Sequence, residues 1–339
     1  MANLSVDVVT ADYRNPEHAR ALELTLNWHA KDPCGGGAPL DQSILDKIVG
    51  ELAQVPYAFS VLAFVDEKPA GLVNCFLGFS TFAAKPLVNI HDCFVMPEFR
   101  RCGVVNKMLL HVEAIARERG CCKLVLEVLA GNLPAKGAYL KFGFAGYELD
   151  PALGGAEFWQ KKLALVPEVV SVGATEDDVT TAHVDYLDAE SGQSLKLMLG
   201  RYAEDPCGGG EPLNQTILDT VVGELAQVPY AFSILAFVDG KPAGLVNCFL
   251  GFSTFAAKPL VNIHDCFVMP EFRRHGVGNK MLLHVEAIAR ERGCCKLVLE
   301  VLAGNLPAKG AYLKFGFAGY ELDPALGGAE FWQKKLKPL

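Results

Sequence analysis

The chain has 339 residues, of which 51% are hydrophobic and 21% are charged. This apolar content excludes a disordered or fibrous chain, and the length is that of two ordinary domains. With 31 Lys and Arg against 39 Asp and Glu, the formal charge of -8 disfavours a protein that tracks nucleic-acid phosphates and suits a cationic small molecule.

The first half of the chain alternates β-rich and helix-rich segments. The first helical segment ends before the Gly-rich run at 35–37, and a later one carries Val105, Met108 and Val112 on one face. The pattern predicts strands on both sides of helices, and therefore an α/β layered fold with a mixed sheet. In chain order we predict strand 6–12, helices 16–31 and 41–52, strands 58–65, 70–79 and 87–96, helix 104–119, strand 123–129, helix 134–142, and strands 145–148 and 157–161.

The chain contains this unit twice. Residues 32–163 match residues 205–336 at a constant offset of 173, with nine differences in 132 positions, and a diverged strand and helix precede each copy. A period this long indicates a duplicated domain. We therefore predict an N-terminal domain over 1–163, a linker over 164–178 and a C-terminal domain over 179–339.

The amino terminus has no signal-like stretch, and no apolar run approaches the roughly 18 residues that span a bilayer, so we expect a cytoplasmic protein without membrane contact. The eleven cysteines include the adjacent pairs Cys121-Cys122 and Cys294-Cys295 inside apolar segments, which we interpret as reduced thiols. Neither the cysteines nor the eight histidines have zinc-site spacing, so no metal is expected.

A glycine-bearing loop precedes the long helix of the second copy. Its pattern Arg273-x-x-Gly276-x-Gly278 presents backbone N–H groups at a helix N-terminus, where they can bind phosphate. It lacks the Gly-Lys-Ser/Thr of a nucleotide P-loop, and taken alone it could equally be a turn that caps an ordinary helix. The loop does not stand alone, because the segment from Asn305 through Tyr312 to Phe317 follows it after one strand.

Together the two motifs, V-x-P-E-x-R-x-x-G-x-G and N-x-x-A-x-x-x-Y-x-x-x-G-F, resemble the GNAT superfamily of N-acetyltransferases over nearly the whole of each copy. The resemblance implies a tandem of GNAT-like folds, each with a mixed, mostly antiparallel, twisted sheet flanked by helices. It implies that this sheet splays between its fourth and fifth strands, where the pantetheine arm of acetyl-CoA inserts. It implies that the backbone of Phe267 and Val268, and of Phe94 and Val95 in the first copy, holds that arm. The further cosubstrate-binding positions that it implies are Arg273, Arg274, His275, Gly276, Val277, Gly278, Asn279 and Asn305, and in the first copy Arg100, Arg101, Gly103, Val105 and Asn132.

The resemblance also makes Tyr312, with Tyr139 as its counterpart, the proton donor to the leaving thiolate. A phenol has a pKa near that of a thiol, which suits this step. The alternative is a half-buried tyrosine of an amphipathic helix. Cys266 lies beside this site, just before Phe267 and Val268, but members of the superfamily transfer acetyl directly to the amine. We therefore do not expect a cysteine nucleophile.

The pattern around residues 253–268 is similar to that of the spermidine/spermine-type acetyltransferases. Where they carry a glutamate that helps to deprotonate the amine, this chain has His264, and His91 in the first copy, followed by the matching Asp265 and Asp92. A histidine is a credible base at neutral pH, although water could serve, and a structural histidine is the alternative. Strand alternation predicts that only one member of each pair faces the acceptor. Glu300 could bind a cationic acceptor or could be a solvated strand residue.

Two differences between the copies fall in the phosphate loop, where Cys102 and Val105 replace His275 and Gly278. Because Val105 would lie close to the pyrophosphate, we expect the first copy to bind acetyl-CoA more weakly, unless its loop shifts slightly and both sites work. Our interpretation is a tandem acetyl-CoA-dependent N-acetyltransferase for a small, polyamine-like amine. Alternatives are an aminoglycoside-like or peptide N-terminal acceptor, or a silent binding or scaffold role for the first half. The fused copies could form an internal pseudo-dimer, and the chain could also form a homodimer.

Overall fold

The structure is a computed structural model that describes residues 5–163 and 179–336. Each repeat forms strands and helices in the order that the sequence predicts, with ends shifted by a residue or two. The predicted linker, 164–178, lies outside the described residues. The first repeat comprises β1 (Val6–Thr10), α1 (Pro16–Lys31), α2 (Gln42–Ala53), β2 (Ala58–Val65), β3 (Lys68–Ser80), β4 (Lys85–Val95), α3 (Val104–Glu118), β5 (Lys123–Leu129), α4 (Leu133–Phe142), β6 (Ala145–Gly146) and β7 (Ala156–Lys162).

The second repeat comprises the same elements in the same order, together with short 3-10 turns. They are β8 (Val179–His183), α5 (Ala189–Glu204), α6 (Gln215–Ala226), β9 (Ala231–Val238), β10 (Lys241–Ser253), β11 (Lys258–Val268), α7 (Val277–Glu291), β12 (Lys296–Leu302), α8 (Leu306–Phe315), β13 (Ala318–Gly319) and β14 (Ala329–Lys335).

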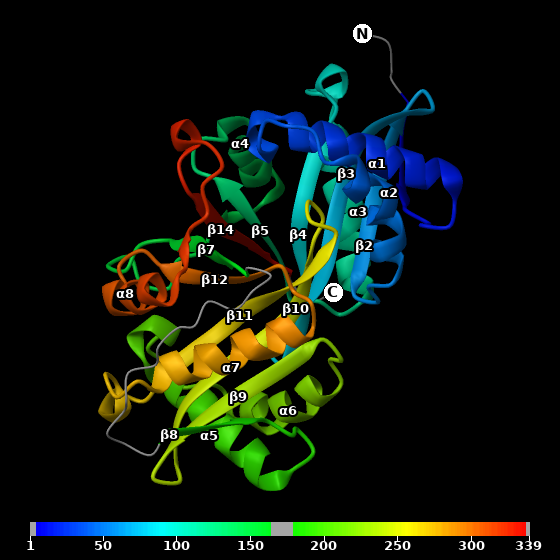
Figure 1. The fold of residues 1–339 in the computed structure, drawn as a ribbon. Helices are drawn as coiled ribbons and strands as arrows, with labels where there is room; N and C mark the ends of the chain where they lie inside the picture. The colour runs from blue at the N-terminus through cyan, green and yellow to red at the C-terminus, as the bar shows by residue number, and fades with distance from the viewer. Residues whose placement is uncertain (1–4, 164–178, 337–339) are drawn as a thin grey trace.

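The last strand of each repeat joins the sheet of the other repeat. β14 pairs with β5 along its whole length, and β7 pairs with β12, so the strand order is β1-β2-β3-β4-β5-β14-β7-β12-β11-β10-β9-β8. In Figure 1 the red β14 lies beside β5 of the first half, and the green β7 lies beside the orange β12. The two halves are therefore interlocked by backbone hydrogen bonds in one mixed, mostly antiparallel sheet.

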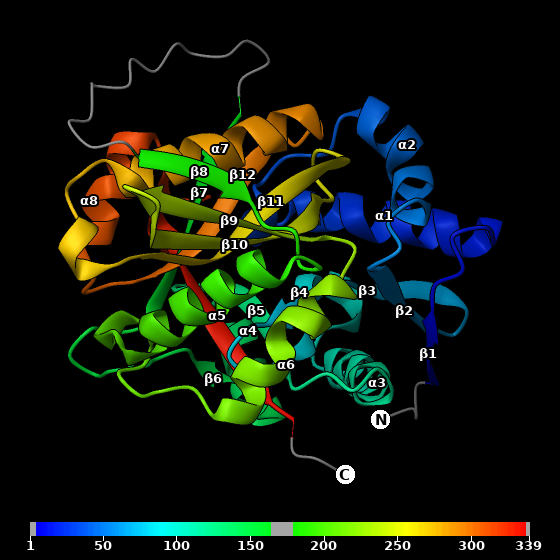
Figure 2. The same ribbon diagram turned by 90° about the horizontal axis from the view of Figure 1, so that it is seen from below.

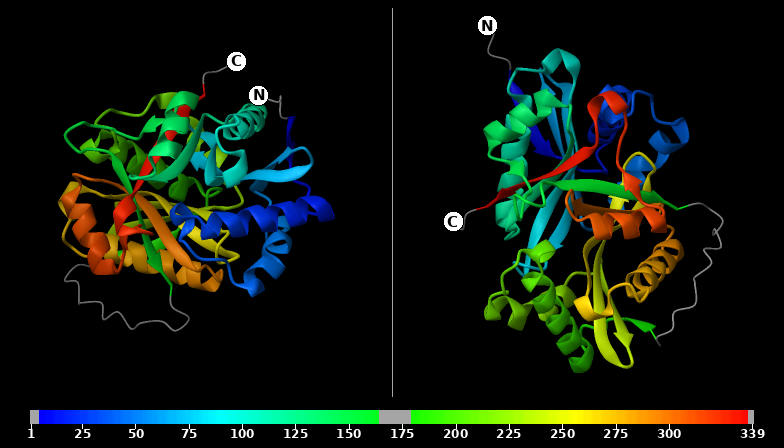
Figure 3. Two further views of the ribbon diagram at one scale, coloured as in Figure 1. Left: turned by 90° about the horizontal axis from the view of Figure 1, so that it is seen from above. Right: turned by 90° about the vertical axis from the view of Figure 1, so that its left-hand side faces the viewer.

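The two faces of the sheet have different cores. Against one face, α3 and α4 pack on the first half and α7 and α8 on the second, each pair with its own buried cluster. On the other face, α1, α2, α5 and α6 bury a single cluster that contains residues of both halves, including Leu22 and Leu195. Tyr57 and Tyr230 meet across the halves with ring centroids 4.7 Å apart. The views in Figures 2 and 3 show these helices around the joint between the halves.

The sheet splays where the resemblance places the cosubstrate. β4 and β5 pair in parallel at three positions only, from Val88 to Ile90, although β4 continues to Val95. β11 and β12 do the same from Val261 to Ile263. The predicted splay between the fourth and fifth strands is confirmed in both halves.

Candidate active site

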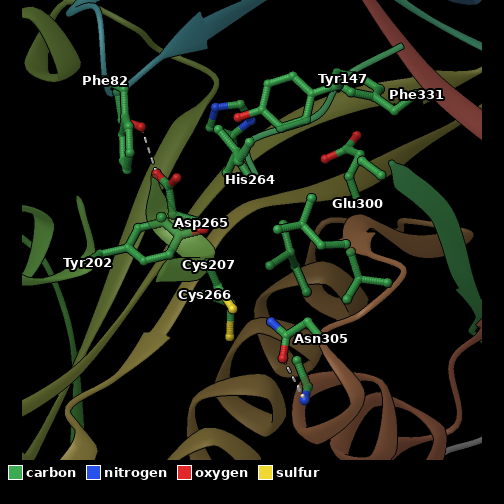
Figure 4. Close-up of a pocket in the computed structure, with 18 of the residues that line it drawn as sticks. Phe82, Tyr147, Tyr202, Cys207, His264, Asp265, Cys266, Glu300, Asn305 and Phe331 are labelled. Atoms are coloured by element: carbon green, nitrogen blue, oxygen red, sulfur yellow. Dashed lines mark hydrogen bonds between the residues drawn. The ribbon is translucent and has the colours of Figure 1, made fainter. Parts of the chain in front are cut away.

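A pocket lies at the joint between the halves, and residues of both repeats line it. It holds about 990 Å³ of empty space, including its open mouth, which is enough for a small ligand. Figure 4 shows Phe82 and Tyr147 of the first repeat facing His264, Asp265 and Glu300 of the second.

His264 and Asp265 both line this pocket, and a β-bulge explains how. Along β10 and β11, Asn247 pairs with Asp265 and the next residue, Cys248, pairs with Ile263, so His264 is the extra residue. A bulge breaks the alternation of side chains between faces. The expected alternation, which would put the two side chains on opposite faces, is therefore wrong here, and both side chains line the pocket. The same bulge occurs at His91 and Asp92.

The Asp265 carboxylate is buried and held by residues of both repeats. Its Oδ2 accepts hydrogen bonds from Asn247 Nδ2 and from Thr81 Oγ1, each 2.8 Å long. Ser233 Oγ donates to Asn247 Oδ1 at 2.6 Å and lies 2.8 Å from the hydroxyl of Tyr186. The carboxylate is thus fixed in position, and Thr81 ties it to the opposite half.

His264 is neutral near pH 7. Burial lowers the pKa of its imidazole, and this effect outweighs the attraction of the Asp265 charge, while Lys123 lowers the pKa further. The ring packs edge-on against Phe249, with centroids 5.4 Å apart. A neutral imidazole that borders a pocket can accept a proton.

Tyr312 lies 8% exposed in the same pocket, beside Cys266. Burial, and then the charge and hydrogen bond of the Cys266 thiol, raise the pKa of Tyr312 well above its usual value. Burial likewise raises the pKa of Cys266 to about 11. Both groups therefore stay protonated. Tyr312 carries a proton to donate, although its raised pKa makes it a weaker acid than an exposed phenol, and Cys266 has little thiolate with which to act as a nucleophile.

An aromatic clamp closes one side of the pocket. The Tyr202 ring lies between Phe82 of the other repeat and Phe267, with centroid distances of 5.4 and 5.5 Å. Gly208 in the following turn passes so close to the Tyr202 carbonyl that a Cβ would overlap it. That close contact fixes the end of α5 against the pocket.

The phosphate loop has the geometry of an anion site. Gly276 has φ +78° and is the N-cap of α7, and its position carries no side-chain hydrogen bond to the first turn. The N–H groups of that turn are thus available to a ligand. A Cβ at Gly278 would meet only Val268 Cγ2, at 3.7 Å, so the protein itself has room for a side chain there.

The other predicted cosubstrate residues surround this loop. The Arg273 guanidinium donates to the Val268 carbonyl at 3.0 Å and to Asp205 at 2.6 Å, so it braces the loop against the end of α5. Arg274 and His275 are exposed, Val277 and Phe267 are buried, and Asn279 is partly buried. Asn305 lines the pocket, and its Oδ1 caps α8 by accepting from the Ala308 N–H at 3.2 Å.

The acetyltransferase (GNAT) family model matches residues 18–144 and 204–317. The chain belongs to this family. A streptothricin acetyltransferase of Streptomyces lavendulae is 41% identical over 88 residues, which is 26% of this chain and 44% of that protein. A thialysine N-epsilon-acetyltransferase of Caenorhabditis elegans is 31% identical over 78 residues, 23% of this chain and 48% of that protein. The chain thus spans about half the length of these curated relatives.

Two solved structures share the fold over nearly the whole of this chain. A tandem GNAT protein from the clavulanic acid biosynthesis pathway has a TM-score of 0.55 and 14% identity and covers 98% of both chains. A GCN5-related N-acetyltransferase from Sphaerobacter thermophilus has a TM-score of 0.56 and 14% identity, over 99% of this chain and 96% of that one. Among the described residues, no helix is long and apolar enough to cross a membrane, and no cluster of His, Cys, Asp or Glu could hold a metal.

The first GNAT half repeats this arrangement, with one substitution in the aromatic clamp and with Cys102 and Val105 in the loop in place of His275 and Gly278. His91, Asp92, Tyr139, Phe94 and Val95 occupy the same strand and helix positions, and Arg100 braces its loop to Asp32 at 2.7 Å. Arg101 and Gly103 keep the positive φ angles of their counterparts, Asn132 caps α4, and Val105 lies partly buried in the first turn of α3.

In the aromatic clamp of the first half, His29 stands at the position that Tyr202 has in the second half. Its Nδ1 lies 3.7 Å from Asp92 Oδ1, too far for a hydrogen bond, and burial lowers its pKa despite the Asp92 and Asp32 charges. Thr254, the counterpart of Thr81, is fully buried, and its hydroxyl has no partner among the described residues. The two GNAT sites are thus not equivalent.

The sequence analysis missed the residues that each repeat contributes to the other's site. Thr81, Phe82, Lys123 and Tyr147 line the pocket of the second half, yet they belong to the first repeat. No local pattern marks them, because their role depends on how the halves interlock. The repeat itself was the available signal, since two copies of one fold can exchange identical strands.

Proposed function

We propose that the chain is an acetyl-CoA-dependent N-acetyltransferase that transfers acetyl directly to the primary amine of a small, polyamine-like cation. The observation that carries the proposal is the convergence of His264, Asp265 and Tyr312 on one pocket beside the splayed strands. Family membership supports acetyl transfer and acetyl-CoA as the cosubstrate.

The second half offers groups that suit acetyl-CoA. The unpaired edges of β11 and β12 can bond the pantetheine amides through the backbone of Phe267 and Val268. The first turn of α7, which no side chain caps, can bind the pyrophosphate between Gly276 and Asn279. In the first half, Val105 places two methyl groups at the corresponding first turn of α3. We propose that this half binds acetyl-CoA more weakly.

The chemistry needs a neutral amine, a fixed geometry and a proton for the leaving thiolate. Neutral His264 can take the proton of the bound ammonium, directly or through water, and the nearby Asp265 charge stabilises the resulting imidazolium. The amine nitrogen then bonds to the thioester carbonyl carbon, the carbon–sulfur bond breaks, and the nitrogen releases its second proton to solvent as the amide forms. Tyr312 gives its proton to the departing thiolate and is reprotonated from solvent.

Charge supports a cationic acceptor. The chain carries a formal charge of -8, and Glu300 and Asp265 place carboxyl groups in the pocket. The thialysine-acetylating relatives support an amine acceptor, and the streptothricin-acetylating relative adds a second compound to screen. We further propose that the interlocked halves form an internal pseudo-dimer.

The test is acetyl transfer from acetyl-CoA to diamines, followed by product mass and free thiol. Tyr312→Phe should lower turnover by about 100-fold or more, because it removes the proton donor, and should leave acetyl-CoA binding intact. Tyr139→Phe is the matched control and should have a much smaller effect. Undiminished turnover in the Tyr312 variant would contradict the assignment.

A further inference from the structure

A second cavity lies on the pseudo-two-fold axis that relates the repeats. Ten residues of one repeat and the ten at the same positions of the other line it, and it holds about 670 Å³ of empty space including its openings. Glu127 and Glu300 face it from β5 and β12, next to Phe331 and Phe158 on the two exchanged strands. Strand exchange therefore creates one central chamber from two identical half-sites.

The chamber has acceptor groups without matching cations. Glu127 Oε1 accepts from Asn89 Nδ2 at 3.1 Å, and Glu300 Oε1 accepts from Asn262 Nδ2 at 3.2 Å. In the described part of the chain, neither carboxylate has an ion-pair partner within 4 Å. The Oδ1 atoms of Asn89 and Asn262 are buried and have no hydrogen-bond partner there. Buried carboxylates and amide oxygens that lack donors call for an N–H-bearing cation.

The walls suit a cation with an aliphatic body. Phe158, Phe331, Phe76 and Phe249 line the chamber, and aromatic faces attract ammonium groups while methylene groups pack against them. His91 and His264 also line it, and burial lowers the pKa of both, so they add no positive charge near pH 7.

The chamber adjoins the candidate active site, because His264, Glu300 and Phe331 line both cavities. A molecule with one end near Tyr312 must pass these shared side chains to reach the two glutamates. By the symmetry of the repeats, the first half reaches the same chamber through His91 and Glu127.

We propose that this central chamber is a shared subsite for the second ammonium of a linear diamine or polyamine, and that it serves both halves but holds one such ligand at a time. The proposal rests on the amine-acetylating function proposed above. Glu127, which belongs to the opposite repeat, thereby helps to select the acceptor of the second half.

The electrostatics agree with the geometry. Withdrawal from solvent and then the charge of Glu127 raise the pKa of Glu300 to about 8, and withdrawal from solvent raises that of Glu127 to about 7, although Lys123 and Lys296 act in the opposite direction. In the empty chamber Glu300 is therefore mainly protonated near pH 7, and a bound ammonium would favour the ionised form of both carboxyl groups, whose protons pass to solvent.

The experiment compares linear diamines of increasing length with amino alcohols of the same length, in which a hydroxyl replaces the second ammonium. In the full chain, Glu127→Gln should weaken diamine binding by about tenfold or more and leave amino alcohol binding nearly unchanged. Glu157→Gln is the matched control, because Glu157 lies near the same axis, outside the chamber, in an ion pair with Lys309. Calorimetry on the unmodified chain should give one diamine per chain.

Equal effects of Glu127→Gln on diamines and amino alcohols, or two diamines bound per chain, would overturn the shared subsite. If the variant does not fold, the stoichiometry of the unmodified chain decides. Diamine binding is measured without turnover, so the two proposals fail separately. The absence of any acetylated product would contradict the proposed function, whereas the binding data alone decide whether the chamber is a shared subsite.

Discussion

The buried pair Thr81 and Thr254 offers a direct test of how the halves meet. Both side chains are at most 1% exposed, and they occupy the same position of the two repeats. Thr81 Oγ1 donates to the Asp265 carboxylate at 2.8 Å, whereas Thr254 Oγ1 has no partner among the described residues. Valine has nearly the shape of threonine and lacks the hydroxyl.

Thr81→Val removes a charge-assisted hydrogen bond, so we expect it to lower the free energy of unfolding by about 1.5–3 kcal/mol. Thr254→Val removes a buried hydroxyl without a partner, so it should leave stability unchanged or raise it by about 1–3 kcal/mol. The free energies of unfolding of the two variants should therefore differ by at least about 1.5 kcal/mol, with Thr81→Val the less stable. Urea unfolding resolves a difference of this size.

Activity adds a second measure. Thr81 belongs to the first repeat, yet Thr81→Val should lower acetyl transfer by the second half, because Asp265 loses one of its two hydrogen-bond donors. Equal losses of stability and equal turnover in the two variants would refute the non-equivalence of the sites.

Three further outcomes follow from the same structure. Val105→Gly should strengthen acetyl-CoA binding by the first half about tenfold or more, and Gly278→Val should weaken binding by the second, both measured by calorimetry; no change in either would contradict the effect of the side chain on the loop. The carboxyl of Glu300 has a pKa raised to about 8, and Glu127, Lys123 and His264 surround it. The folded chain thus keeps a proton that the unfolded chain releases above its ordinary pKa of 4.5, so the free energy of unfolding should fall as pH rises from about 5 to about 9. Glu300→Gln should reduce that fall in urea unfolding, and an unchanged pH dependence would show that the carboxyl is not enclosed. A fragment of residues 179–339 lacks β7, leaves the edge of β12 unpaired and should form a dimer by exchanging β14, as light scattering would show; a folded monomer would contradict the role of the exchange.

Local order was predictable from the sequence because hydrophobic period and turn residues act over short distances. The helix at 104–119 appears as α3, and the hairpin at 58–79 appears as β2 and β3. The splay of the sheet followed from the family resemblance and is confirmed. These features depend on residues within one copy.

The pocket was less predictable because it depends on contacts between copies. His264 faces the same cavity as Asp265 through a bulge whose extra residue has no mark in the sequence. Thr81 meets Asp265 only because the halves interlock, 184 positions apart in the chain. Glu300 was predicted to be either a cation-binding or a solvated residue. That Glu300 and Glu127 line one cavity depends on the exchanged strands, which no pattern within one copy reveals.

Calorimetric titration of the full chain with acetyl-CoA tests the account most directly, since every step depends on that cosubstrate. The account predicts one tight site, weakened by Gly278→Val, and a second site that is weaker and gains affinity in Val105→Gly. Two equally tight sites would contradict the role of Val105, and no binding at all would contradict the proposed acetyl transfer.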